Sequence, residues 1–164
     1  MINRFLFALT LFSALGCGLV AGIFFAFSTF VIKALARLLP GQGIAAMQSI
    51  NVAVINPWFL TAFLGTGAGC LVLGVSSLFQ WHKPSAIFCL AGSLLYLIGT
   101  ILVTLVFNVP LNDGLATVDP ASVNGASVWT GYVTNWTAWN HVRTAAALAA
   151  AALLTVALHV DASR

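Results

Sequence analysis

NHVRTAAALAAAALLTVALHV, residues 140–160, decides how this chain folds. Its apolar part, residues 145–160, is too short to cross a bilayer, because a membrane-spanning helix needs about 20 residues. The helix must therefore include Asn140, His141 and Arg143, or their immediate neighbours. An ionisable side chain near the bilayer centre costs about 2.5–3.5 kcal/mol on insertion scales, so its presence there indicates a functional site.

The composition is that of an integral membrane protein. Of the 164 residues, 61% are hydrophobic and 5% are charged, and none is glutamate. A soluble domain carries about 25% charged residues. The net charge of +3 is small and scattered, which argues against a nucleic-acid partner. All three cysteines lie in apolar runs, so we interpret them as small buried hydrophobic residues rather than as disulfides or ligands.

Four hydrophobic segments are long enough to span a bilayer: residues 5–32, 57–80, 85–107 and 137–160. We therefore predict an all-α fold, an integral membrane four-helix bundle in which residues 1–164 form one domain. Small residues recur in the first two segments, as is typical of closely packed membrane helices. Contact between copies of the chain explains the same pattern, so the sequence is also consistent with a homo-oligomer. These small residues are Ala14, Gly18, Gly22, Ala26, Gly65 and Gly69.

Two longer connections lie on the membrane face where the fourth span begins. The first contains a short helix, predicted at residues 44–55, which we expect to lie in the membrane interface. The second, residues 108–127, is rich in loop residues, and Pro110 is expected to break the third helix at the membrane edge. Cationic side chains divide almost equally between the two faces. The positive-inside rule then places both termini in the cytoplasm by a narrow margin.

Polar side chains gather at this same membrane face. Gln48 and Asn51 share one side of the short helix, and Asn108 and Asn112 lie at the end of the third span. Each pair also has a structural explanation, as the polar side of an interfacial helix or as partners of exposed helix-end carbonyls. Together with His141, these amides favour a functional pocket.

At 100° per residue, the start of the fourth helix has two faces of different chemistry. His141 shares one face with three threonines, Thr134, Thr137 and Thr144. Either the helix starts or kinks near Asn140, or the two faces have separate roles. An interfacial aromatic belt, with Arg143 reaching the headgroups, is the structural alternative. The other face, an arc of about 100°, carries Trp129, Tyr132, Trp136, Trp139, Asn140 and Arg143.

The sequence predicts no metal site. No cluster of histidine, cysteine and carboxylate side chains has metal-ligand spacing, and no nucleotide-binding motif is present. His82 and His159 are expected at the opposite membrane face. His159 lies 18 residues after His141, or about 27 Å away at helical rise, so the sequence does not support paired haem ligands.

Four segments of the chain resemble the DUF1772 family, also called the anthrone oxygenase family. The resemblance covers nearly the whole chain. Members are small four-span membrane proteins, and some fungal members oxidise anthrones to anthraquinones without a metal or flavin. The resemblance therefore implies a cofactor-independent monooxygenase that uses molecular oxygen on a small, lipid-soluble aromatic substrate. The segments are GIFFAFS (22–28), QSIN (48–51), NVPLN (108–112) and WTAWNHVR (136–143).

The implied chemistry assigns roles to individual residues. His141 removes a proton from the acidified ring CH₂, because imidazole exchanges protons near neutral pH, and the resulting anion reacts directly with oxygen. The substrate oxygen that gains negative charge is expected to be stabilised by Arg143, Asn140, Asn108 and Asn112. The expected substrate-binding residues are Trp136, Trp139, Tyr132 and Phe27, which stack on a flat polycycle, and the polar Ser28, Gln48 and Asn51.

Two other functions are consistent with the same residues. A non-enzymatic membrane protein would bind or move a small hydrophobic or anionic molecule, with Arg143 as the anchor for an anion. A transporter of this length would have to oligomerise. An assembly factor would bind no ligand at all. Substitution of His141 separates these functions, because turnover requires the base whereas ligand retention depends on Arg143.

Overall fold

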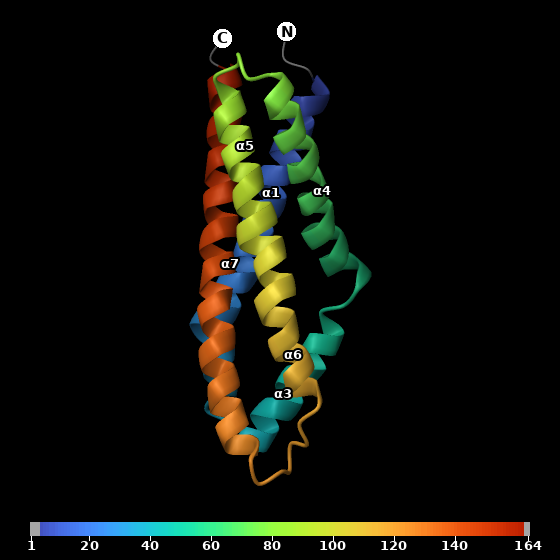
Figure 1. Cartoon of the computed structure of the whole chain (residues 1–164), viewed down its shortest axis with the longest axis vertical. Helices are drawn as coiled ribbons and strands as arrows, with labels where there is room; N and C mark the ends of the chain where they lie inside the picture. Colours follow the sequence, from blue (N-terminus) through green and yellow to red (C-terminus); the bar gives the residue numbers. More distant parts are fainter. Residues whose placement is uncertain (1–3, 163–164) are drawn as a thin grey trace.

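Helices make up almost the whole chain in the computed structural model, which describes residues 4–162 and shows no strand among them (Figure 1). The predicted fold class, a helical membrane bundle, is confirmed. The first helix begins and the last one ends at the same end of the bundle (Figure 1). Four helices are long and apolar enough to cross a membrane: Arg4–Leu35, Pro57–Phe79, Ser85–Ala116 and Gly125–Val160.

The first span is not a uniform helix. It consists of α1 (Arg4–Ala26), a π-helical turn η1 (Phe27–Val31) and α2 (Ile32–Leu35). π-Helical turns inside longer helices are rare and are frequent at functional sites. The turn here coincides with the aromatic and hydroxyl segment that the sequence analysis singled out.

The short helix predicted after the first span is present as α3 (Pro40–Ala53), and it begins at Pro40 rather than at residue 44. It lies at the end of the bundle away from the termini (Figure 1). α4 (Pro57–Phe79) follows after a short turn. Asn56 caps α4, because its side chain accepts a hydrogen bond of 3.0 Å from the backbone N–H of Phe59.

The third span continues beyond the proline that was expected to end it. Pro110 follows a π-helical segment directly and stands in the first turn of α6. Membrane helices tolerate proline where local π-helical geometry rearranges the backbone hydrogen bonds. The predicted break is therefore wrong, and Asn108 and Asn112 lie on a continuing helix. Its segments are α5 (Ser85–Tyr96), η2 (Leu97–Leu102), η3 (Thr104–Asn108) and α6 (Val109–Ala116).

The last helix, α7 (Gly125–Ala162), begins well before the predicted start at residue 137. Its first turns carry aromatic side chains that pack against α3 and α6, and Trp129 and Tyr132 are 4% and 5% exposed. This packing extends the helix towards the loop. Because α7 is helical through Asn140, the alternative in which the helix starts there is wrong. Separate roles for its two faces stay a prediction.

Two apolar clusters fill the interior. One joins α1, α4, α5 and α7 through residues such as Val20 and Tyr96. The other joins α2, α3, α6 and the start of α7, and it includes Trp136. Along α7, the buried side chains of Asn140 and Arg143 separate the two clusters. A polar layer therefore interrupts the apolar core.

Small residues mediate close helix contacts, but only in part those that the sequence pattern predicted; Ala14 is buried in the core. Gly69 is one that was predicted: a Cβ added there would lie 2.5 Å from the Ser13 hydroxyl oxygen. A Cβ at Gly99 would overlap Ala146 of α7. The other predicted glycines have nothing within 4 Å of an added Cβ, so they do not serve packing inside the bundle: Gly18, Gly22 and Gly65. Contact between copies at these positions stays a prediction.

We expect Gly99→Ala to lower the free energy of unfolding by about 1–3 kcal/mol, because the new methyl group overpacks the contact with α7. Gly22→Ala is the matched control and should change it by less than about 0.5 kcal/mol, since the added group meets open space. Thermal unfolding of both variants in detergent measures the difference. Equal melting temperatures would contradict the packing described here.

Candidate functional site

Arg143 is buried in the polar layer, with 4% of its side chain exposed. Its Nη1 donates to the Thr104 hydroxyl at 3.2 Å. Its Cζ lies 4.1 Å from the centre of the Phe24 ring and 5.3 Å from that of Trp136, so the charge rests between two aromatic faces. Among the side chains described, those of residues 4–160, no carboxylate pairs with it. The alternative in which Arg143 reaches the lipid headgroups is therefore wrong.

Asn140 holds this cation and ties it to the first span. Its Oδ1 accepts from Arg143 Nη2 at 2.5 Å, and its Nδ2 donates to the Phe24 carbonyl at 2.7 Å and to the Ser28 hydroxyl oxygen at 2.5 Å. A carbonyl can only accept and a guanidinium can only donate. The amide nitrogen of Asn140 must therefore face the Phe24 carbonyl, and its oxygen must face Arg143. The fully buried amide thus joins α7, α1 and η1.

Other polar atoms near this layer have no partner in the described part of the chain. Asn108 is 1% exposed and donates to the Trp136 carbonyl at 3.2 Å, but its Oδ1 accepts nothing. Trp136 Nε1 and Arg143 Nε are likewise buried and unpaired. Buried polar groups are nearly always hydrogen-bonded. Several exceptions in one place mark the layer as a functional candidate.

The predicted stacking residues stack on one another. Tyr132 lies between Trp129 and Trp136, with ring centres 5.7 Å and 6.3 Å apart. Phe27 packs against Trp136 with a centre distance of 6.0 Å. Trp139 stacks instead on Phe107 of the third span, at 3.5 Å. Of these rings, Trp136 also lies against Arg143, and the contact of any of them with a substrate stays a prediction.

The remaining predicted amides lie in a second polar group, formed by α3, α6 and the start of α7. Gln48 Nε2 donates to the carbonyls of Leu115 and Val118, each at 2.9 Å, and thereby holds the end of α6. The Tyr132 hydroxyl donates to Asn112 Oδ1 at 2.8 Å. Asn51 also belongs to α3, and its Nδ2 is buried without a partner among residues 4–162. This group braces α3 and α6 against α7.

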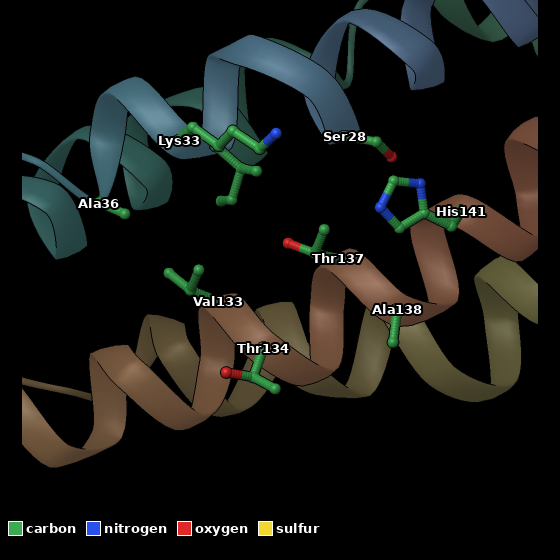
Figure 2. Close-up of a pocket in the computed structure, with 9 residues that line it drawn as sticks. Ser28, Lys33, Ala36, Val133, Thr134, Thr137, Ala138 and His141 are labelled. Carbon is green, nitrogen blue, oxygen red and sulfur yellow. The ribbon is translucent and has the colours of Figure 1, made fainter.

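His141 lies on the other face of α7, beside a pocket of about 400 Å³ that opens at the bundle surface (Figure 2). The walls are mostly apolar. In Figure 2 the imidazole, the Ser28 hydroxyl and the Thr137 hydroxyl border the same space, with Lys33 on the wall formed by the first span. The lining residues are Ser28, Ile32, Lys33 and Ala36 of the first span, and Val133, Thr134, Thr137, Ala138 and His141 of α7.

Of the predicted site residues, His141 and Ser28 line this pocket, whereas Arg143 and Asn140 lie behind it. Sequence reasoning missed Lys33 and Thr137 as pocket residues. For Thr137 a signal existed, since it lies four residues before His141 on the same helical face. Lys33 follows Ser28 by five residues. In a regular α-helix these two side chains would point to different sides, but the π-helical turn between them brings both to the same side.

Comparison with known proteins supports a family assignment. The sequence profile of the anthrone oxygenase family matches residues 58–153, which include α4, the whole third span and most of α7. His141 and the Asn140–Arg143 pair lie within the match, whereas Ser28 and Lys33 lie outside it. No curated protein and no solved structure matches the chain.

Asn140→Leu, which removes the amide partner of Arg143, should destabilise the bundle more than Arg143→Met, which removes the charge itself. Asn140→Leu leaves a buried cation without its amide partner, and we expect a loss of about 3 kcal/mol. In an Arg143→Met background the same change should cost only about 1 kcal/mol, since no charge is then stranded. Unfolding of the two single variants and the double variant in detergent measures the coupling.

Asn135→Leu is the matched control, because Asn135 is an exposed amide on the same helix. Its substitution should leave stability within about 0.5 kcal/mol of the wild type. Additive effects of Asn140→Leu and Arg143→Met would show that the amide does not stabilise the buried charge.

Proposed function

Because this chain belongs to the anthrone oxygenase family, we propose that it is a membrane-embedded oxygenase that uses molecular oxygen on an anthrone-like or related lipid-soluble phenolic substrate. The observation that carries the proposal is the pocket beside His141. Its volume of about 400 Å³ is in the range of small-molecule sites, and its apolar walls with a few polar groups are typical of them.

The position of the pocket suits a substrate dissolved in the bilayer. It opens at the surface of the bundle between the first and last spans, and the side chains at its mouth include the exposed Ala36 and Ala138. A flat polycycle therefore reaches His141 from the lipid without passing through the apolar clusters. This access explains why a pocket of this kind belongs in a membrane protein.

In the proposed reaction, His141 takes a proton from the CH₂ group that lies between two aryl rings, opposite the carbonyl. The electron pair of the broken C–H bond delocalises to the carbonyl oxygen and gives an aromatic enolate. The carbanionic carbon then bonds to O₂, and the imidazolium returns its proton to form a hydroperoxide. Loss of water leaves a new carbonyl. The CH₂ group and O₂ thus become C=O and H₂O, and no separate reductant is needed.

Two pocket residues support this chemistry. Lys33 places a positive charge on the wall facing α7, whereas Arg143 is not among the lining residues. We therefore assign to Lys33 the role that the sequence analysis gave to Arg143, attraction of the negative charge of the enolate. The Thr137 hydroxyl is unpaired within residues 4–162, so a polar substituent of the substrate is its proposed partner.

Oxygen uptake with a simple anthrone tests the proposed function. Wild-type protein in detergent should consume oxygen above the spontaneous rate, and His141→Ala should lose about 100-fold or more of that acceleration, because a positioned base contributes about 10²–10⁴-fold. His82→Ala is the matched control, since His82 is exposed in the turn between α4 and α5. It should retain the wild-type rate.

All three proteins need equal melting temperatures for this comparison. Uptake that persists in His141→Ala would remove the base from the mechanism. An absence of uptake in the wild type, combined with saturable anthrone binding, would favour the alternative function of a ligand-binding membrane protein.

Lys33→Met should lower kcat/KM for the anthrone by about tenfold. The loss of one contact between the ammonium group and the enolate raises the activation free energy by about 1.4 kcal/mol, which corresponds to that factor. Arg37 is exposed in the turn after α2 and lies outside the pocket lining, so Arg37→Met should leave kcat/KM unchanged. Steady-state oxygen uptake measures both. Equal losses in the two variants would show a general surface-charge effect instead of a contact in the pocket.

A further inference from the structure

The buried cation and the open pocket meet at one hydroxyl group. Ser28 lines the pocket, yet its side chain is only 1% exposed and its oxygen accepts from the Asn140 amide, which in turn accepts from Arg143. We propose that Ser28 is the hydrogen-bond donor to the substrate oxygen that gains charge, and that Arg143 is a positioning residue that strengthens this donor through Asn140. The inference rests on the proposed function in one respect, that the substrate is a phenol or aromatic ketone.

The Ser28 hydroxyl does not make the hydrogen bond that helical hydroxyl groups usually make. Helical serines and threonines commonly donate to the carbonyl four residues earlier, and Thr29 does so to the Phe25 carbonyl at 2.7 Å. For Ser28 that carbonyl belongs to Phe24, and it accepts from Asn140 Nδ2 at 2.7 Å instead. Among the groups described over residues 4–160, none accepts from the Ser28 hydroxyl. Its hydrogen therefore remains for a ligand in the pocket.

The chain of donors runs in one direction, from the charge to the pocket. Arg143 donates to Asn140 and Asn140 donates to Ser28, each at 2.5 Å. Hydrogen bonds in series polarise one another, and the effect is larger in a low-dielectric interior. No carboxylate among the described side chains neutralises Arg143, so its positive charge polarises the amide. The Ser28 O–H group becomes a stronger donor to a negatively charged oxygen.

The placement of Ser28 also matches that of the base. Figure 2 shows the Ser28 hydroxyl and the His141 imidazole on different walls of the same pocket, one from the first span and the other from α7. In an anthrone the carbonyl oxygen and the acidic CH₂ lie on opposite sides of the central ring. When the enolate oxygen is bound at Ser28, the CH₂ group on the opposite side of the ring points towards α7. The two walls thus divide the roles of oxyanion donor and base.

The test uses 1-naphthol, a flat phenol whose ionised form absorbs at a longer wavelength than the neutral form. The quantity measured is the pH at which half of the protein-bound naphthol is ionised. Ser28→Ala should raise this midpoint by about one pH unit, because one hydrogen bond to the charged form is lost. Arg143→Met should raise it in the same direction, although Arg143 does not line the pocket. Ser28→Thr, which keeps the hydroxyl, should restore the wild-type midpoint.

Ser77→Ala is the matched control: Ser77 is buried on α4 and donates to the Leu73 carbonyl at 2.7 Å. It should leave the midpoint unchanged. An unchanged midpoint in Ser28→Ala, or wild-type protein that does not bind naphthol, would overturn the proposal. A shift in Ser28→Ala without one in Arg143→Met would overturn the part assigned to Arg143.

The ionisation midpoint of bound naphthol and the oxygen uptake with an anthrone test this inference and the proposed function separately. If the wild type consumes no oxygen with an anthrone but the naphthol midpoint depends on Ser28, the oxygenase function fails and the oxyanion site stands. If oxygen uptake depends on His141 but the midpoint does not depend on Ser28, the oxygenase function stands and this inference fails.

Discussion

The buried charge of Arg143 is the constraint on which the rest of the structure depends. A cation in an apolar interior is costly unless hydrogen bonds and favourable faces compensate for the lost water. Here no carboxylate of the described residues does so, and the compensation comes from an amide, a hydroxyl and two aromatic rings. These groups belong to the first, third and last spans. Holding one guanidinium therefore fixes three helices relative to one another.

The three π-helical segments of the described residues all supply residues that contact α7 or lie beside such a contact. Ser28 belongs to η1, Thr100 and Gly99 to η2, and Thr104 and Asn108 to η3. Each wider turn shifts side chains relative to a regular helix, and such turns are frequent at functional sites. The polar layer also separates the two apolar clusters. Its outer edge at Ser28 reaches the pocket, so the same hydrogen bonds that stabilise the cation also shape the proposed oxyanion donor.

Sequence alone predicted the fold class and, for a helix that is regular through Asn140, the division of the last helix into two faces, because both follow from general rules. Few charges and four long apolar segments require a helical membrane bundle. A rotation of 100° per residue places Arg143 and His141 on different sides whatever the rest of the chain does. The profile match over residues 58–153 confirms the family that the WTAWNHVR and NVPLN segments resembled.

What sequence could not predict depends on tertiary packing. Pro110 normally ends a helix, but π-helical geometry carries the third span past it. The glycines at Gly18 and Gly22 have the spacing of a packing motif, yet neither touches another helix in the bundle. The pocket joins Lys33 to His141 across 108 positions of the sequence, and no local pattern links them. Arg143 resembled an interfacial anchor because two of the groups that enclose it, the Thr104 hydroxyl and the Phe24 ring, lie on other spans.

Photolabelling with benzophenone tests most directly the claim that an aromatic ketone occupies this pocket. Benzophenone, like anthrone, has a carbonyl between two aryl rings, and light makes it react with nearby C–H bonds. Mass spectrometry of the labelled peptides should locate the adducts within residues 28–36 and 133–141, and excess anthrone should suppress them. Adducts spread evenly over the lipid-facing sides of α4 and α5, without competition by anthrone, would contradict the assignment of the pocket as the substrate site.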